Sequence, residues 1–289
     1  MCKRIYRKHN KMIYHSIKKF FKSIIGILRI LKQGNYFSYK QFSPVPNNKM
    51  LRILGNGKSL NEVSLNENKD IDYLVVNRHV LGDNYTNIKP SYYVLADPHF
   101  FNHQEGINII KEINAKTTWP LNLCIVYNRT TKKKIRNIIN NPYITLITYN
   151  TCSFDGYNRI KYLTFNWQLA MPVVQNVLVA SLMIGIQKKY SIIELYGVEH
   201  TWTKYLFVND NNVVYLENPH FFDKEKVAAK PVKEIQHTEE YPFYLILKNY
   251  SRMFESYWDI KEYLKTSKKN TKIINCTKGS FIDAFERKH

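Results

Sequence analysis

Short apolar runs alternate with helix-forming stretches along the chain from Met50 onwards. Several runs contain no alternating polar residues, which is typical of strands buried on both faces of a parallel sheet. The alternation predicts an α/β fold with a mostly parallel sheet and helices on both faces. We expect strands at residues 50–54, 73–76, 92–95, 123–127, 143–148, 192–196 and 272–275, helices at 173–188 and 254–265, and a hairpin at 205–208 and 213–216.

An amphipathic pattern precedes this body, over residues 11–33. Basic side chains gather on one side of the expected helix, where Ile30 is the one apolar exception. The pattern favours a helix that lies in the membrane interface, and a helix that packs on the protein's own body is the alternative. Apolar runs here are far shorter than the roughly 18 residues that would span a bilayer. The apolar stripe comprises Ile13, Ile17, Phe20, Phe21, Ile24, Leu28 and Leu31.

Charge is unevenly distributed along the 289 residues, which carry 43 Lys and Arg against 23 Asp and Glu, a formal charge of +20. Fourteen of the basic residues precede Glu62, the first acidic residue. This assigns residues 1–33 to a basic helix on an anionic membrane surface, while the nearly balanced body is not expected to bind nucleic acid. Pro44 and Pro46 predict a linker over residues 34–49, which places the folded domain at 50–289.

The sharpest local signal is a glycine turn after the first strand, with the sequence LGNGKSL. Gly55 and Gly57 allow positive φ and a close approach of the backbone to a ligand. Asn56 and Ser59 lie at an expected helix start, where backbone N–H groups and the helix dipole favour a phosphate. The turn lacks the third glycine of G-x-G-x-x-G and the ending of a Walker A loop. A tight turn that binds no ligand is therefore the alternative.

Polar residues follow three further strands where these strands end. Asn77, Asp97 and Glu199 come after the second, third and sixth expected strands. Parallel strands end at one edge of a sheet, so we expect these side chains beside the glycine turn. Such a convergence of amide and carboxylate groups favours a binding site over scattered structural residues.

The order of these motifs resembles bacterial lipooligosaccharide sialyltransferases over residues 51–286. Uncharacterised proteins of surface-polysaccharide gene clusters are equally similar, and the 6-hydroxymethylpterin diphosphokinase-like fold shares mainly the glycine turn. The resemblance implies a Rossmann-like fold with a lid insertion, and transfer of sialic acid or a related sugar from a nucleotide-sugar donor without a metal. The motifs that carry it are LGNGKSL, VVNRH, YVLADPHFF, NVLVASLMIGI, IIELYGVEH and IINCTKGSFIDAF.

The resemblance also implies roles for single residues. Asn56, Gly57 and Asn77 would contact the nucleotide, and Asp97 stands where that family has an asparagine that contacts the donor. A lid histidine serves there as the general base, a task that suits a side chain titrating near neutrality. Lid tyrosines hydrogen-bond the leaving phosphate. Within an expected lid at residues 201–241, His220 is the favoured base with His237 behind it, and Tyr205 and Tyr215 are the candidate tyrosines.

Two other classes of function stay open from the sequence. Asp97 and Glu199 would suit a divalent metal in a diphosphokinase-like phosphotransferase. A membrane-peripheral binding protein without activity is the other class. The favoured hypothesis is an inverting glycosyltransferase without cofactor or bound metal, peripheral to the cytoplasmic side of the inner membrane. Its partners would be a nucleotide sugar, a glycan or glycolipid acceptor and the anionic membrane, and its oligomeric state is left open.

Overall fold

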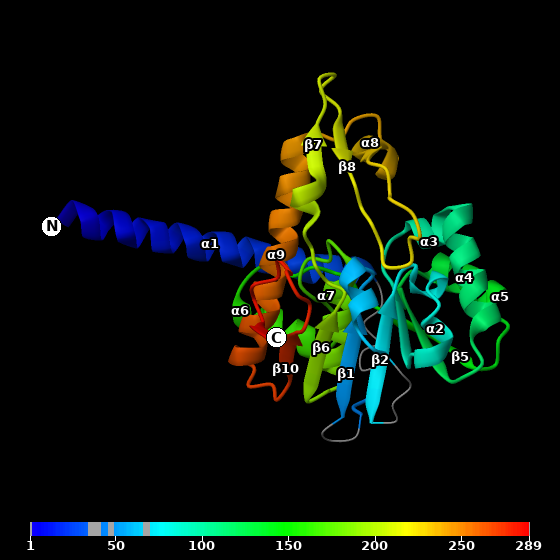
Figure 1. Cartoon of the computed structure of the whole chain (residues 1–289). Coiled ribbons are helices and arrows are strands. Elements are labelled where there is room, and N and C mark those ends of the chain that lie inside the picture. Colours follow the sequence, from blue (N-terminus) through cyan, green and yellow to red (C-terminus); the bar gives the residue numbers. More distant parts are fainter. Residues whose placement is uncertain (1, 34–41, 46–48, 66–69, 289) are drawn as a thin grey trace.

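A central sheet of eight strands forms the body of the computed structural model, which describes residues 2–33, 42–45, 49–65 and 70–288. Every neighbouring pair of strands is parallel, in the order β11-β10-β6-β1-β2-β3-β4-β5 (Figure 1). The chain runs outward from β1 to β5 and then returns to β6 on the other side of β1, which makes β1 and β6 the topological switch point. The strands are β1 (Met50–Leu54), β2 (Ile71–Val76), β3 (Tyr92–Leu95), β4 (Leu121–Val126), β5 (Ile144–Tyr149), β6 (Ile192–Tyr196), β10 (Lys272–Asn275) and β11 (Glu286–Arg287).

Helices cover both faces of this sheet and enclose two large apolar clusters. One cluster contains side chains of α6, α7 and α9, and the other contains side chains of α2, α3, α4 and α5. Residues of α7 are buried without a break from Val177 to Ile186, as expected for a helix that is apolar on all sides. The helices are α1 (Cys2–Gln33), α2 (Tyr85–Ile88), α3 (His99–Asn102), α4 (Gln104–Lys116), α5 (Arg129–Ile138), α6 (Asn158–Asn166), α7 (Val177–Gln187), α8 (Val232–Ile235) and α9 (Phe243–Thr266), with 3-10 turns at Lys58–Glu62, His79–Leu81 and Trp202–Tyr205.

The expected lid forms a small layer of its own above the carboxyl ends of the strands (Figure 1). It contains the antiparallel strands β7 (Leu206–Val208), β8 (Val214–Leu216) and β9 (Lys230–Pro231), followed by α8. A separate apolar cluster of Val214, Val232 and Ile246 holds this layer against α9. The lid therefore has an apolar cluster of its own, and Phe221 of the segment after β8 also packs into the cluster of the body.

The α/β fold with a mostly parallel sheet is confirmed, and all seven predicted strands are present within two residues at each end. The helix expected at 173–188 begins only at Val177, because Asn176 caps its first turn. The helix expected at 254–265 is the second half of α9, which begins at Phe243. The glycine turn leads into a short 3-10 turn at Lys58–Glu62 and not into an α-helix.

The amino-terminal helix docks on the body through small residues and leaves its apolar stripe outside. Ser23 and Gly26 are buried against the loop that contains Phe154 and Tyr157, and Ser23 Oγ accepts a 3.0 Å hydrogen bond from the Tyr157 amide. Ile30, the apolar exception on the basic side, is 8% exposed. All seven residues of the predicted stripe are at least 39% exposed, and the helix projects away from the body (Figure 1).

Two further observations concern this part of the chain. Phe42 is buried in the core and the Val45 amide donates to the Lys188 carbonyl, so these residues of the predicted linker lie against the body. Residues 34–41 and 46–48 lie outside the described residues. Within the described part of the chain, no helix is long and apolar enough to cross a membrane.

Candidate functional site

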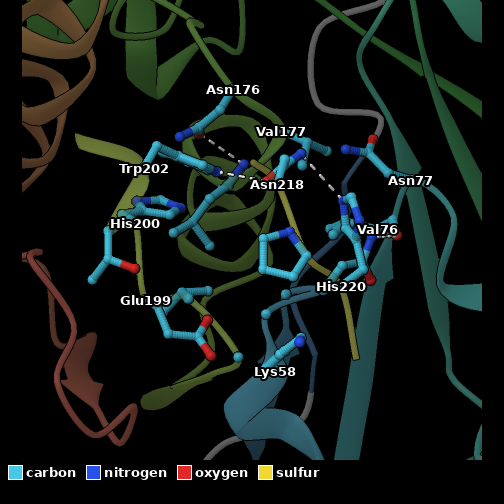
Figure 2. Close-up of a pocket in the computed structure, with 18 of the residues that line it drawn as sticks. Lys58, Val76, Asn77, Asn176, Val177, Glu199, His200, Trp202, Asn218 and His220 are labelled. Carbon is cyan, nitrogen blue, oxygen red and sulfur yellow. Dashed lines mark hydrogen bonds between the residues drawn. The ribbon is translucent and has the colours of Figure 1, made fainter. Parts of the chain in front are cut away.

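A cavity of about 250 Å³ opens at the switch point, between the carboxyl ends of β1, β2 and β6. The first turn of α7, with Asn176 and Val177, and two lid segments, one with Trp202 and one with Asn218 and His220, surround it (Figure 2). Ligands of open α/β sheets bind in this place, because the loops that leave the strands diverge there. The polar side chains of its lining are Asn56, Lys58, Asn77, Asn176, Glu199, His200, Thr201, Trp202, Tyr205, Asn218 and His220.

The glycine turn forms one wall of the cavity and is held by the loop that follows β6. The Gly55 amide donates to the Tyr196 carbonyl over 2.8 Å, and the Gly57 amide donates to the Gly197 carbonyl over 2.9 Å. A side chain at Gly55 would overlap the backbone of Gly197, so glycine is needed for this close approach. The glycines thus join two strand ends, a structural role that the sequence pattern did not reveal.

The Glu199 carboxylate is hydrogen-bonded to a backbone amide of the turn, in the place where the sequence predicted a phosphate. Glu199 Oε1 accepts a 2.6 Å hydrogen bond from the Ser59 backbone amide, and its side chain lies directly over Gly57. A phosphate at this point would meet the negative charge of Glu199 and would have to displace it. The phosphate site predicted at the start of the turn is therefore already filled, although Lys58 beside it is exposed to the cavity.

Two asparagines present acceptors that have no partner among the described residues. The Oδ1 atoms of Asn56 and Asn77 are both buried and form no hydrogen bond with that part of the chain. Asn56 Nδ2 donates to the Val76 carbonyl over 3.2 Å, which fixes the orientation of its amide. Asn77 is held at φ +52° while its carbonyl accepts from the Tyr93 hydroxyl over 2.6 Å. Buried acceptors without partners are costly, so these oxygens indicate a ligand that supplies hydroxyl or amine donors.

The first turn of α7 directs the positive end of its helix dipole at the cavity. Asn176 Oδ1 accepts from the amides of Leu178 and Val179 at 3.0 and 3.3 Å. Asn176 Nδ2 donates to the Tyr257 hydroxyl over 2.8 Å, which ties this turn to α9. Because α7 is buried along its whole length, this terminus is a fixed electrostatic feature of the site.

His200 is part of an aromatic stack at the cavity wall. Its ring lies 4.5 Å from Trp202 and 5.6 Å from Tyr257, both nearly parallel to it, and its Nδ1 is 3.2 Å from the Tyr257 hydroxyl. Burial lowers the pKa of His200 to about 3, so this imidazole is neutral at physiological pH. Trp202 continues the stack onto Tyr250 and donates its Nε1–H to Asn218 Oδ1 over 3.0 Å. The stack offers a flat aromatic surface beside the polar cavity.

His220 lies at the cavity between a carboxylate and an amide side chain. Its Nδ1 lies 3.6 Å from Asp223 Oδ2, and the same carboxylate accepts a 2.6 Å hydrogen bond from the His220 amide. The Asn218 amide lies 3.5 Å from Nε2, the nitrogen on the other side of the ring, too far for a strong hydrogen bond (Figure 2). Burial lowers the pKa of His220, and the charge of Asp223 opposes that shift. A neutral ring with a carboxylate at Nδ1 leaves Nε2 as the proton acceptor.

The structure brings together most of the residues predicted for the site, but not all. Gly55, Asn56, Gly57, Asn77, Glu199, Tyr205 and His220 line the cavity. Ser59 contributes its amide to Glu199, while its hydroxyl is buried outside the lining.

Three predicted residues are placed elsewhere among the described residues. Asp97 is exposed and accepts from the His99 amide at the start of α3, so it does not share the cavity with Glu199 as a metal site would require. Tyr215 stacks on Phe207 across the lid strands, because paired residues of a hairpin face the same side. His237 lies beside His99 and His103, since α8 turns it toward α3 and away from the cavity.

Sequence reasoning assigned no role to Asn176, Asn218 or Asp223. Asn176 carries a signal that was available, because asparagine before an apolar helix is a common N-cap. Asn218 and Asp223 lie two residues before and three residues after His220, and only the fold of the lid places them at its ring nitrogens. Comparison of the chain with protein-family profiles, with curated proteins and with solved structures gave no match.

Proposed function

We propose that this protein is an inverting glycosyltransferase that moves a sugar from a nucleotide-sugar donor to a cell-surface glycan. The observation that carries the proposal is one cavity at the switch point that joins two unpartnered asparagine oxygens to a His220–Asp223 pair. The asparagines call for hydroxyl or amine donors, which ribose, base and sugar all supply. The histidine supplies the base that transfer to a hydroxyl requires.

Several residues of the cavity have separate roles in the proposed reaction. His220 Nε2 takes the proton of the acceptor hydroxyl while the acceptor oxygen bonds to the anomeric carbon of the donor. The bond from that carbon to the phosphate oxygen breaks, and its electron pair stays on the nucleotide phosphate. Lys58 and the first turn of α7 stabilise this growing negative charge. Asn218 has to swing away from Nε2, and its 3.5 Å contact is weak enough to allow that.

A second cavity at the same sheet edge offers room for the acceptor. It has a volume of about 610 Å³ and lies at the carboxyl ends of β3 and β4, on the other side of the segment that leads into α7. Its lining is mildly polar, with Asn102, Asn128, Thr130, Thr131 and Thr151 beside Phe101, Tyr127 and Val174. Hydroxyl and amide side chains next to aromatic rings are suited to carbohydrate. We assign the donor to the first cavity and the acceptor to this one.

We also propose that the protein acts at a membrane surface. Phe20, Phe21 and Leu28 are 52%, 58% and 58% exposed on α1, with lysines and an arginine on the adjoining side. Docking through Ser23, Gly26 and Ile30 holds the helix on the body while this apolar stripe stays uncovered. An anionic bilayer matches both the apolar stripe and the basic flank. A lipid-linked glycan acceptor would then be delivered to the cavity edge. The donor sugar follows the sialyltransferase resemblance: sialic acid or a related sugar.

The test is turnover of a panel of nucleotide sugars by the full chain in the presence of lipid-linked glycan acceptors. We expect release of one nucleotide with transfer of its sugar. His220→Gln should lose this activity, and His15→Gln on α1 is the matched control that should keep it. A folded protein that turns over no donor, or a His220→Gln variant with normal turnover, would contradict the assignment.

A further inference from the structure

Three histidines from distant parts of the chain meet outside the cavity. His99, His103 and His237 each offer a ring nitrogen, and these nitrogens all lie within 4.8 Å of one another. The rings are stacked, with centroids 4.8 Å apart for His99 and His103, 4.8 Å for His103 and His237, and 5.8 Å for His99 and His237. No other group of three such ligands occurs in the described part of the chain.

The body supplies two of the three rings on a fixed support. His99 begins α3, and His103 is the extended residue between α3 and α4, where its amide donates to the His99 carbonyl over 3.1 Å. Phe100 and Phe101 between them are buried in the core and anchor the turn. Asp97 Oδ1 accepts the His99 amide over 2.8 Å and holds the start of α3. The pair of imidazoles is thus positioned by the sheet and not by a mobile loop.

The lid supplies the third ring. His237 follows α8 at φ +53°, with its amide bonded to the Glu234 carbonyl over 3.2 Å. Val232 of the same helix is buried in the apolar cluster of the lid, which fixes α8 relative to β8. His237 therefore reaches α3 from a part of the fold with separate packing. The cluster is a junction between the lid and the body.

We propose that His99, His103 and His237 bind a divalent transition metal of the zinc class and thereby tie the lid to the body. Imidazole nitrogen is a preferred ligand of Zn²⁺, at about 2.0 Å, and three such ligands define a known type of site. Tetrahedral angles require nitrogens about 3.3 Å apart. The exposed His103 and His237 rings therefore turn out of their stack with His99 when the ion binds.

A fourth ligand is at hand. His99 Nε2 lies 3.2 Å from Glu105 Oε2, so a carboxylate already stands beside one of the three rings. Arg78 Nη1 holds Glu105 Oε1 at 2.6 Å, which leaves Oε2 of the same carboxylate beside His99. Three imidazoles and one carboxylate suit Zn²⁺ better than the oxygen-preferring Mg²⁺ or Ca²⁺.

Metal binding at this junction has a consequence for the cavity but does not depend on the proposed sugar transfer. The lid carries Trp202, Asn218 and His220, so a metal that fixes the lid on α3 also steadies these side chains over the cavity. The role is positional, since none of the three ligands lines the cavity.

The test is calorimetric titration of Zn²⁺ into the full chain, prepared without a polyhistidine tag and stripped with a chelator. We expect one Zn²⁺ per chain, and an affinity at least about 100-fold weaker in His103→Ala and in His237→Ala, more than the loss of a supporting residue would cause. His15→Ala, an exposed histidine on α1, is the matched control and should bind like the native chain.

Hydrogen exchange supplies a second readout that is independent of activity. Zn²⁺ should slow amide exchange over residues 230–241 in the native chain and should have no such effect in His237→Ala. Absence of stoichiometric Zn²⁺ binding by the folded chain would overturn the proposal. Unchanged affinity in His103→Ala and His237→Ala, both exposed positions with folding checked by circular dichroism, would overturn it as well.

Discussion

The carboxylate of Glu199 lies directly over Gly57, where a side chain on that residue would overlap it. The same carboxylate accepts the Ser59 amide over 2.6 Å. The glycine turn is therefore closed by a charge from the neighbouring loop and joins β1 to β6 at the switch point. The sequence of this turn resembles a phosphate-binding loop. In the structure the turn links the ends of β1 and β6 and also lines the cavity.

This relationship predicts coupling between the two positions. Gly57→Ala should destabilise the protein by about 1–3 kcal/mol, because the new methyl group displaces Glu199. In Gly57→Ala/Glu199→Ala the methyl group meets no carboxylate, so the double variant should lose less than the sum of the two single variants, with a coupling of about 0.5–3 kcal/mol. Urea unfolding of the four proteins measures this. Additive losses would show that Glu199 does not restrict the turn.

The His220–Asp223 pair predicts a pH profile for transfer. Burial holds the pKa of His220 below its usual value, so the neutral base persists as pH falls and the acidic limb of kcat should lie below about pH 6.5. Asp223→Asn removes the charge that opposes this shift, so the limb should move to still lower pH while kcat falls. His220→Gln should reduce kcat by about 10²–10⁴-fold. Rates measured from pH 4 to 8 test this. An acidic limb at the same pH in the native chain and in Asp223→Asn would contradict an electrostatic interaction between His220 and Asp223.

Two histidines whose pKa is lowered in the fold, the buried His79 and the half-buried His200, predict loss of stability in acid. Burial lowers the pKa of His79 and of His200 to about 3, against about 6.5 in the unfolded chain. The unfolded state therefore takes up protons first as pH falls below about 6.5, and stability declines from there down to about pH 3. At pH 5 each histidine should cost about 2 kcal/mol relative to neutral pH. His79→Leu should remove its share and leave that of His200. Equal losses in both proteins, measured by urea unfolding, would argue against burial as the cause.

Most of the fold could be predicted from the sequence because its strands are continuous apolar runs with buried faces, and such runs identify a parallel sheet. Residues that end a strand, such as Asn56 and Asn77, could be placed at one edge by topology alone. The docking face of α1 could not be predicted. Ser23 and Gly26 pack closely on the body because they are small, and neither is an apolar position that a periodicity search would identify. The separation of Asp97 and His237 from Glu199 and His220 could not be predicted either, since the sequence does not show where the side chain of a polar residue after a strand or in a lid points.

The exposed stripe of α1 predicts binding to anionic vesicles. Phe21→Glu/Leu28→Glu should weaken cosedimentation with phosphatidylserine vesicles by at least about tenfold, since each side chain loses apolar burial and adds a repelled charge. Folding should be unaffected because both residues are 58% exposed. Tyr143→Glu, at a 50% exposed position on the body, is the matched control. Unchanged vesicle binding by the double variant, or binding that does not depend on the phosphatidylserine content, would favour another role for the exposed stripe of α1.

The most direct measurement of the central claim is the thermal shift that nucleoside phosphates cause. CMP, UDP, GDP and ATP are added in turn to the native chain and to Asn77→Gly, a variant that tolerates the positive φ of this position but lacks the buried acceptor. We predict that one of the four stabilises the native chain by about 2.7 kcal/mol at 100 times its Kd, and that Asn77→Gly loses most of this shift at the same concentration. No shift with any of the four, in a native chain that unfolds cooperatively, would contradict the account.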